Sequence, residues 1–226
     1  MIASMANEMP NGGEYAATNR IEAFSDGVFS IVITLLILDI RVPLATTLHG
    51  RTLGQALLAQ WPSYAAYVIS FLLVGGVWAN HHVMFRRIRH ADHTIVIWNT
   101  LHLMCTAVLP FTTALLSAYV LGTADQRRIV ALVYSGVLML AGLCYSALWQ
   151  HAVRKRLLES WVTQQDAQRL TRHWMLAPIG YAIAFAVAMV SVPMSLALYV
   201  FVIGYFTLPW PLQRRLRRPV DIPVVQ

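Results

Sequence analysis

An acidic residue, Asp26, lies inside the first long apolar segment of the chain, which runs from about Arg20 to Ile40. An ionisable side chain within a membrane helix is costly, so it usually marks either an ion pathway or a fixed polar contact. Asp26 therefore has two interpretations. It takes part in transport, or it anchors its helix by accepting a hydrogen bond from a His, Asn or Trp side chain on another helix.

More polar and aromatic side chains gather near the ends of the next two apolar segments. The second segment closes with a run that contains Trp78, Asn80, His81 and His82. The third segment carries donors and acceptors in its first half, namely Trp98, Asn99 and His102. Hydrogen bonds between membrane helices contribute about 0.6 kcal/mol each on average, so several together specify packing. We expect these side chains and Asp26 to converge in one half of the membrane.

Catalytic and metal chemistry have little support in these residues. Histidines 81, 82, 90 and 93 are close in sequence, but adjacent histidines on a helix point about 100° apart and the HExxH motif is absent. A nucleophile and base pair such as Ser25 with His81 has no supporting motif. The two cysteines, Cys105 and Cys144, lie in apolar stretches without a CxxC pair and are expected to act as small hydrophobic residues. We expect neither an enzyme nor a metal site nor a cofactor.

The first segment also carries an apolar stripe. At about 100° per residue, Ile31, Leu35 and Leu38 fall on one side of a helix, together with Phe24 and Gly27. Asp26 lies about 140° from Ile31, on the opposite side. If the stripe faces a central axis, Asp26 points back toward the helices behind it. Taken alone, such a stripe is more often ordinary packing.

The composition places the whole chain in a membrane. Of its 226 residues 58% are hydrophobic and only 12% are charged, and the mean hydropathy is +0.57. Soluble domains carry about 25% charged residues, so this chain has too few to cover a surface that faces water. The net charge of +7 comes from short basic clusters. Such clusters set membrane orientation and contact anionic lipids, and they do not require nucleic acid as a partner.

The hydropathy pattern predicts an all-α protein with six membrane-spanning helices. Asn19 is expected to be the N-cap of the first helix, with Glu22 completing a capping box. Pro110 should kink the third helix. The last apolar run would be about 55 Å long as one helix, against a bilayer core of about 30 Å, so it should divide near Ser191–Pro193. The expected spans are Arg20–Ile40, Leu53–Asn80, Thr94–Val120, Arg128–His151, Trp174–Val190 and Met194–Trp210.

The distribution of basic residues predicts the orientation. Thirteen of the 17 Lys and Arg residues fall on the side of both termini, and four fall on the other side. The positive-inside rule then puts both termini in the cytoplasm. The chain divides into a disordered cytoplasmic tail (1–18), a six-helix membrane domain (19–212) and a basic cytoplasmic tail (213–226).

Two motifs resemble a known family. The run Arg20-xxx-Phe24-Ser25-Asp26-Gly27, which opens the first helix, is similar to the signature of the transmembrane protein 175 family of potassium channels, in particular its compact bacterial members. The run Trp78-x-Asn80-His81-His82-xx-Phe85 and the Pro110-Phe111 pair are similar to the same family. In length and number of spans the resemblance extends over the whole chain.

The resemblance implies a homotetramer in a bacterial plasma membrane, with the first helices around a central pore. It implies a constriction formed by Ile31, Leu35 and Leu38, which are the stripe found above, and permeant K⁺ in place of a cofactor. The residues that would hold the first helix against the second and third are Arg20, Phe24, Ser25, Asp26, Gly27, Trp78, Asn80, His81 and His82. Thr34 would offer a hydroxyl to a passing ion, or it would bond back to its own helix.

The expected function is passive cation conduction that prefers K⁺ and extends to other monovalent cations. Asp39, near the outer mouth, is expected to attract cations. The main alternative is a proton-coupled secondary transporter that uses Asp26 with His81 or His82 as a proton relay. The lack of an inverted repeat with interrupted paired helices disfavours that transporter.

Overall fold

The computed structural model describes residues 12–48 and 50–207, and the regular structure in that part of the chain is helical. Two 3₁₀ helices occupy Leu36–Asp39 and Ala45–Thr47. The α-helices are α1 (Gly12–Leu35), α2 (Leu53–Ala59), α3 (Trp61–Phe85), α4 (His93–Ala107), α5 (Leu109–Tyr119), α6 (Ala124–Arg154), α7 (Gln164–Ala188) and α8 (Val192–Thr207).

Four helical stretches are long and apolar enough to cross a membrane: Thr18–Asp39, Trp61–Phe85, His93–Tyr119 and Ala124–Arg154. The helix α8 is apolar but shorter, with 16 residues, and α7 begins with a polar stretch that includes Asp166, Arg169 and Arg172. The predicted class, an all-α membrane protein, is therefore confirmed.

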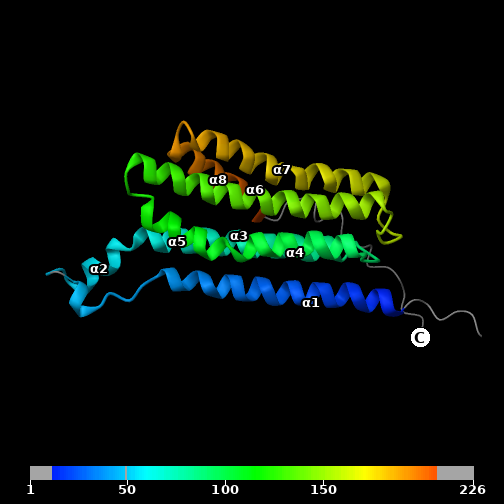
Figure 1. The fold of residues 1–226 in the computed structure, drawn as a ribbon, viewed down its shortest axis with the longest axis horizontal. Helices are drawn as coiled ribbons and strands as arrows, with labels where there is room; N and C mark the ends of the chain where they lie inside the picture. The colour runs from blue at the N-terminus through cyan, green and yellow to red at the C-terminus, as the bar shows by residue number, and fades with distance from the viewer. Residues whose placement is uncertain (1–11, 49, 208–226) are drawn as a thin grey trace, which may run out of the picture.

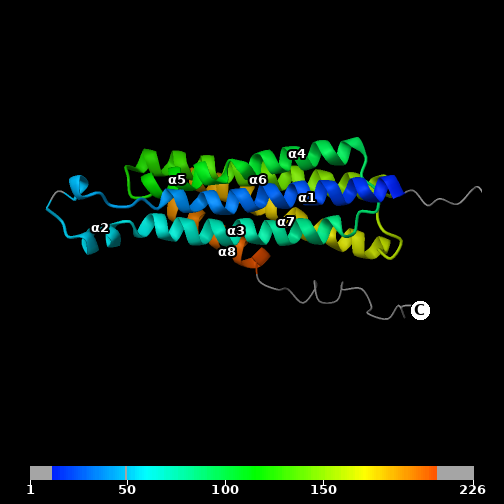
Figure 2. The ribbon, with the colours of Figure 1, turned by 90° about the horizontal axis from the view of Figure 1, so that it is seen from below.

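The helices run back and forth along a single bundle (Figure 1). The starts of α1, α4 and α7 and the ends of α3 and α6 lie at the same end of it. The helix α1 forms one face of the bundle, α3 with α4 and α5 lies behind it, and α6, α7 and α8 form the far side. Seen from below, α1 lies between α3 and α4, and it packs against both (Figure 2).

The first helix begins earlier than predicted. It starts at Gly12, so Asn19 lies inside the helix and its assignment as the N-cap is wrong. Glu14, Ala16 and Ala17 are good helix formers, and nothing between Gly13 and Asn19 breaks the helix. Residues 12–18 of the expected tail are thus helical, whereas residues 1–11 and the expected basic tail at 213–226 lie outside the described residues.

The predicted breaks in the third and last apolar runs are confirmed. The third run is interrupted at Val108, between α4 and α5, with Pro110 in the first turn of α5. Proline has no N–H to donate to the carbonyl of Thr106, four residues earlier, so the helix cannot continue undisturbed. The last run divides where α7 ends at Ala188 and α8 begins at Val192. Beyond Thr207 the predicted sixth span lies outside the described residues.

The loops at the end where α1 begins are tied together. Ile88 and Leu158 form an isolated antiparallel bridge between the α3–α4 and α6–α7 connections. Asp92 caps α4 by accepting a hydrogen bond from the Ile95 N–H at 2.9 Å, and its other oxygen lies 2.7 Å from His151 Nε2. Partial burial acts to raise the pKa of Asp92, but the hydrogen bonds from His151 and the backbone outweigh it and hold that pKa below its usual value.

The interface between α7 and α8 depends on a glycine. A Cβ atom at Gly180 would lie 2.9 Å from Val202 Cγ2, which is closer than two carbon atoms approach unless the Val202 side chain or one of the helices shifts. Small residues are the usual means by which membrane helices come this close. Gly204, in α8, has open space where its Cβ would be.

We predict that Gly180→Ala lowers the stability of the purified protein, whereas Gly204→Ala leaves it unchanged or raises it slightly. Overpacking costs about 1–3 kcal/mol, while Ala is favoured over Gly within a helix by about 1 kcal/mol. Thermal unfolding in one detergent, followed by size-exclusion chromatography, measures both variants. Equal stability of the two variants would show that the α7–α8 contact tolerates a methyl group.

Candidate functional site: the anchored and exposed faces of α1

The first membrane helix has one buried face and one exposed face within the subunit. Residues on the buried face recur every three or four positions, as expected for a helix seated on its neighbours; they are Ser25, Phe29, Val32 and Leu36. The exposed residues follow the same spacing on the other side: Phe24 (62% exposed), Ile31 (60%), Leu35 (42%) and Leu38 (71%). The predicted stripe therefore points away from the other helices of the chain.

A chain of buried hydrogen bonds fixes the side of α1 that faces α4. The Asn99 Nδ2 group donates to Ser25 Oγ at 2.9 Å, and Ser25 Oγ donates to the carbonyl of Ile21 at 2.8 Å. Because the Asn99 amide nitrogen is the donor to Ser25, its oxygen is free to accept, and it lies 2.8 Å from His81 Nε2. His81 is thus the donor in this contact, and Asn99 joins α1 to both α3 and α4.

Two further contacts connect α1 to α3. The Trp78 indole donates to Asp26 Oδ1 at 2.9 Å, so Asp26 has the tryptophan partner that the anchor interpretation requires. One turn closer to the start of α1, Glu22 pairs with His82 Nδ1. The Trp78 and His82 rings stack with their centroids 6.4 Å apart. All of these side chains come from the motif residues of the sequence analysis except Glu22, which had been assigned only to a helix cap.

The remaining motif residues are less closely joined to this network. Arg20, Phe24 and Gly27 are exposed on α1. Asn80 is buried, but it donates to the carbonyls of Gly76 and Phe206, and its own carbonyl accepts from the Tyr145 hydroxyl at 2.9 Å. Asn80 therefore connects α3 to α8 and α6.

A group of buried rings lies behind the anchor and was not predicted as a group. Phe29 meets His81 edge to face, with centroids 5.3 Å apart, and lies 6.2 Å from His102. The rings of His81 and His102 are nearly parallel, at 12° and 6.0 Å. The sequence places Phe29 on the same helix face as Ser25, four residues on, and that spacing was the available signal.

Thr34 and Asp39 lie farther along α1 and the 3₁₀ helix that continues it. The Thr34 hydroxyl donates to the carbonyls of Ile31 and Ser30, at 2.9 and 3.1 Å, which is the bond back to its own helix. Its oxygen lone pairs remain on the exposed side of the helix. Asp39 accepts a hydrogen bond of 2.6 Å from Ser117 at the end of α5. This contact fixes the far end of the segment, as the Asn99 contact fixes its start.

The two faces differ in the chemistry that they offer. The exposed stripe is aliphatic and aromatic, with the Thr34 oxygen beside it. Such a surface can line a passage that opens and closes by wetting. Ser25, Asp26 and Glu22 are instead paired with side chains of α3 and α4. Across residues 12–48 and 50–207, no cluster of three metal-binding side chains is found.

Comparison with known proteins assigns the chain to a family. The family described as endosomal/lysosomal potassium channel TMEM175 matches residues 20–110, which include α3, α4 and the part of α1 from Arg20 onward. A protein of Chamaesiphon minutus, named a potassium channel, is 38% identical over 201 residues, covering 88% of this chain and 98% of that protein. The chain belongs to the TMEM175 family.

Other TMEM175 proteins extend the similarity. A Streptomyces collinus protein, also named a potassium channel, is 43% identical over 190 residues and covers 84% of this chain and 91% of its own length. The crystal structure of the Chamaesiphon minutus homologue, described as lysosomal potassium-selective channel homologue, superposes with a TM-score of 0.77 at 37% identity, covering 84% of this chain and 96% of that one. The family resemblance inferred from the motifs is confirmed, and the family is one of ion channels and not of enzymes.

We predict that Ser25→Ala destabilises the protein more than Ser30→Ala. Removal of the Ser25 oxygen leaves a buried amide donor without its partner, which costs about 1–3 kcal/mol. The Ser30 hydroxyl is exposed and bonds only to the carbonyl of Asp26 on its own helix, so its loss should change stability by less than about 0.5 kcal/mol. Thermal unfolding of the two variants in matched detergent gives the comparison. Equal losses would mean that the Asn99 contact does not hold α1.

Proposed function

We propose that this chain is a potassium-preferring cation channel whose subunits assemble with α1 around a central pore. The observation that carries the proposal is that α1 is bonded to its neighbours on one face and exposed on the other. Its polar face is bonded to α3 and α4, and its apolar face is exposed along the outside of the bundle. An exposed stripe on the helix that carries the family signature is explained if other subunits surround it. The names of the two bacterial relatives support potassium as the permeant ion.

In this proposal Ile31, Leu35 and Leu38 form the constriction, one ring of side chains for each position. A narrow aliphatic ring excludes water when it is closed and admits partly dehydrated ions when it is open. Potassium holds its water less tightly than sodium does, so entry into such a ring costs potassium less. The Thr34 oxygen would lie beside these rings and could coordinate an ion, since its hydrogen is donated to the helix backbone.

The subunits are proposed to be homotetrameric, with six spans each and both termini in the cytoplasm of a bacterial cell. The alternating direction of α1, α3, α4–α5, α6, α7 and α8 supports an even number of crossings (Figure 1). The basic loops that follow α3 and α6 lie at the same end as the start of α1. That end would face the cytoplasm of the plasma membrane under the positive-inside rule.

The proton-coupled transporter has less support than the channel. A proton relay from Asp26 to a histidine needs the two groups within hydrogen-bond distance of each other or bridged by one water. Asp26 instead accepts from Trp78, His81 contacts Asn99, and His82 pairs with Glu22. We therefore assign Asp26 to the support of α1 and not to the transport of protons.

We predict that Leu35→Ala raises potassium flux through purified protein in liposomes severalfold and lowers the preference for potassium over sodium. The smaller side chain widens the ring and lets ions pass with more of their water. The matched control is Leu176→Ala, which makes the same change on α7, on the far side of the bundle from α1, at a residue that is 47% exposed. Its flux should equal that of the unchanged protein.

The same liposomes test the rival functions. Vesicles that stay tight to potassium with the unchanged protein would contradict the channel. Flux that appears only with a proton gradient and saturates with potassium would favour the transporter. An equal rise in flux for Leu35→Ala and Leu176→Ala would indicate leakage from damaged protein and would remove α1 as the pore lining.

We predict that Asp39→Asn lowers single-channel potassium conductance at low salt and has little effect at high salt. The reason is that Asp39 would attract cations at the outer mouth, and salt screens such an effect within about 10 Å at 0.1 M and about 3 Å at 1 M. Because Asp39 also accepts from Ser117, the control is Ser117→Ala, which removes the contact and keeps the charge. If Ser117→Ala reproduces the loss, Asp39 acts by positioning the helix and not by its charge.

A further inference from the structure

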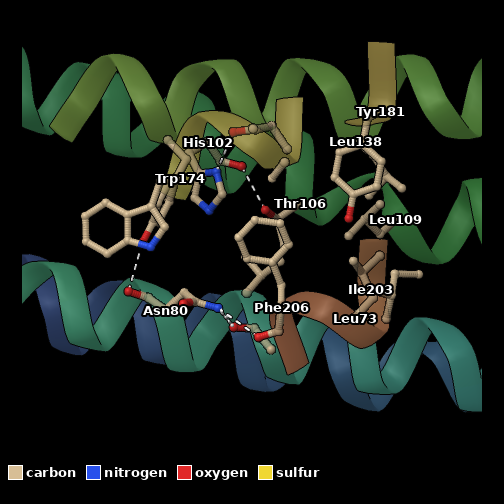
Figure 3. Close-up of a pocket in the computed structure, with 16 residues that line it drawn as sticks. Leu73, Asn80, His102, Thr106, Leu109, Leu138, Trp174, Tyr181, Ile203 and Phe206 are labelled. Atoms are coloured by element: carbon tan, nitrogen blue, oxygen red, sulfur yellow. Dashed lines mark hydrogen bonds between the residues drawn. The ribbon is translucent and has the colours of Figure 1, made fainter. Parts of the chain in front are cut away.

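Each subunit contains a cavity of about 70 Å³ between α3 and the helices behind it (Figure 3). Its walls come from α3, α4, α5, α6, α7 and α8, and they are mostly apolar side chains such as Leu73, Leu109, Leu138 and Ile203. Phe206, in the last turn of α8, closes one side. A water molecule needs about 10–15 Å³ of a cavity measured in this way, so about five waters would fit. A small substituted ring takes up a similar volume.

One buried polar atom in this wall has no partner. His102 is 2% exposed, and its Nδ1 lies 3.0 Å from the carbonyl of Ala141. A carbonyl only accepts, so Nδ1 carries the hydrogen and Nε2 is left with a bare lone pair. No hydrogen-bond partner reaches Nε2 from the described residues, and a buried acceptor left unsatisfied is unfavourable. The ring points from α4 into the space bounded by Trp174, Asn80 and Phe206 (Figure 3).

Neighbouring polar groups on the wall do not supply the missing hydrogen. The Thr106 hydroxyl donates to the carbonyl of His102, and the Tyr145 hydroxyl donates to the carbonyl of Asn80. The Asn80 amide donates to the carbonyls of Gly76 and Phe206. The cavity thus combines a mostly apolar wall with a buried acceptor that no described residue satisfies.

We propose that this cavity is a binding site for a small apolar molecule that carries one hydroxyl group, such as a phenol or a short cyclic alcohol. The hydrocarbon part would contact the aliphatic and aromatic wall, and the hydroxyl would donate to His102 Nε2. A pure hydrocarbon would fill the space but leave the acceptor unsatisfied. The site goes beyond the proposed channel function and does not depend on it.

The position of the site gives such a ligand a route to α1. The His102 ring lies parallel to the His81 ring, and His81 donates to Asn99, which donates to Ser25 of α1. A molecule that is hydrogen-bonded to His102 would therefore lie beside the pair of stacked rings, His81 and His102, that supports the Asn99–Ser25 contact of α1.

Heavy-atom quenching of tryptophan fluorescence tests the proposal on the full-length purified protein in lipid nanodiscs. The probes are 4-iodophenol and 4-iodotoluene, which differ by a hydroxyl in place of a methyl group. Trp174 lines the cavity, so its quenching reports occupancy. We expect saturable quenching by both probes, with 4-iodophenol about three- to ten-fold tighter because of one added hydrogen bond.

Four variants test whether the saturable quenching comes from a probe bound in the cavity. Trp174→Phe should remove the saturable component, and His102→Phe should make the two probes bind equally. Ala177→Leu fills the cavity and should abolish saturable quenching, whereas Ala182→Leu, exposed on the same helix, should leave it intact. Each variant is first checked for folding by size-exclusion chromatography, and His102→Phe decides the case if Ala177→Leu does not fold.

Three results would overturn the site. Equal affinity of the two probes for the unchanged protein would show that His102 Nε2 plays no part. Quenching that rises linearly without saturation would show partition into lipid only, and saturable quenching that persists in Trp174→Phe would place the probe elsewhere. Potassium flux measured on the same preparations separates the two proposals, because its presence without saturable quenching rejects this site alone.

Discussion

One buried amide side chain, Asn99, determines how the first membrane helix is held. It donates to Ser25 on α1 and accepts from His81 on α3, so three helices meet at a single group. Between membrane helices there is little hydrophobic driving force, because lipid is as apolar as the side chains that would pack. Directed polar contacts must therefore fix the rotation of α1. With Asn99 in place, only one rotation of α1 satisfies Ser25, and that rotation leaves the Ile31 and Leu35 stripe exposed.

The other contacts of α1 stabilise the same rotation of the helix. Asp26 with Trp78 and Glu22 with His82 lie along its α3 side, and Asp39 with Ser117 holds its far end. The acidic groups of this segment, Glu22, Asp26 and Asp39, are thereby each paired within the chain, whereas Arg20 is exposed on the same side of the helix as Phe24. The proposed passage then depends on aliphatic side chains for closure, and Glu22 and Asp26 serve to position the helix that carries them.

Much of this arrangement follows from local sequence. Helical periodicity alone places Asp26 on the face opposite the Ile31 stripe, and Pro110 predicts the break between α4 and α5. What could not be predicted depends on residues far apart in the chain. Glu22 resembles a capping residue in the sequence because its partner, His82, lies 60 positions away. The contacts of Asn80 with Phe206 and Tyr145 likewise join residues that no local pattern connects. The start of α1 was missed because polar residues in a good helical sequence give no stop signal at the membrane surface.

The 3₁₀ helix at Leu36–Asp39 changes the shape of the proposed throat. In an α-helix, Leu38 would be turned about 60° from Leu35 and lie about 4.5 Å farther along the axis. With about three residues per turn and about 2.0 Å of rise, a 3₁₀ helix brings Leu38 nearly into line with Leu35, at about 6 Å. The two leucines then share one azimuth on the helix, so both would face the axis of the proposed passage at successive heights. The tighter winding would lengthen the dry stretch of that passage without adding a residue to it.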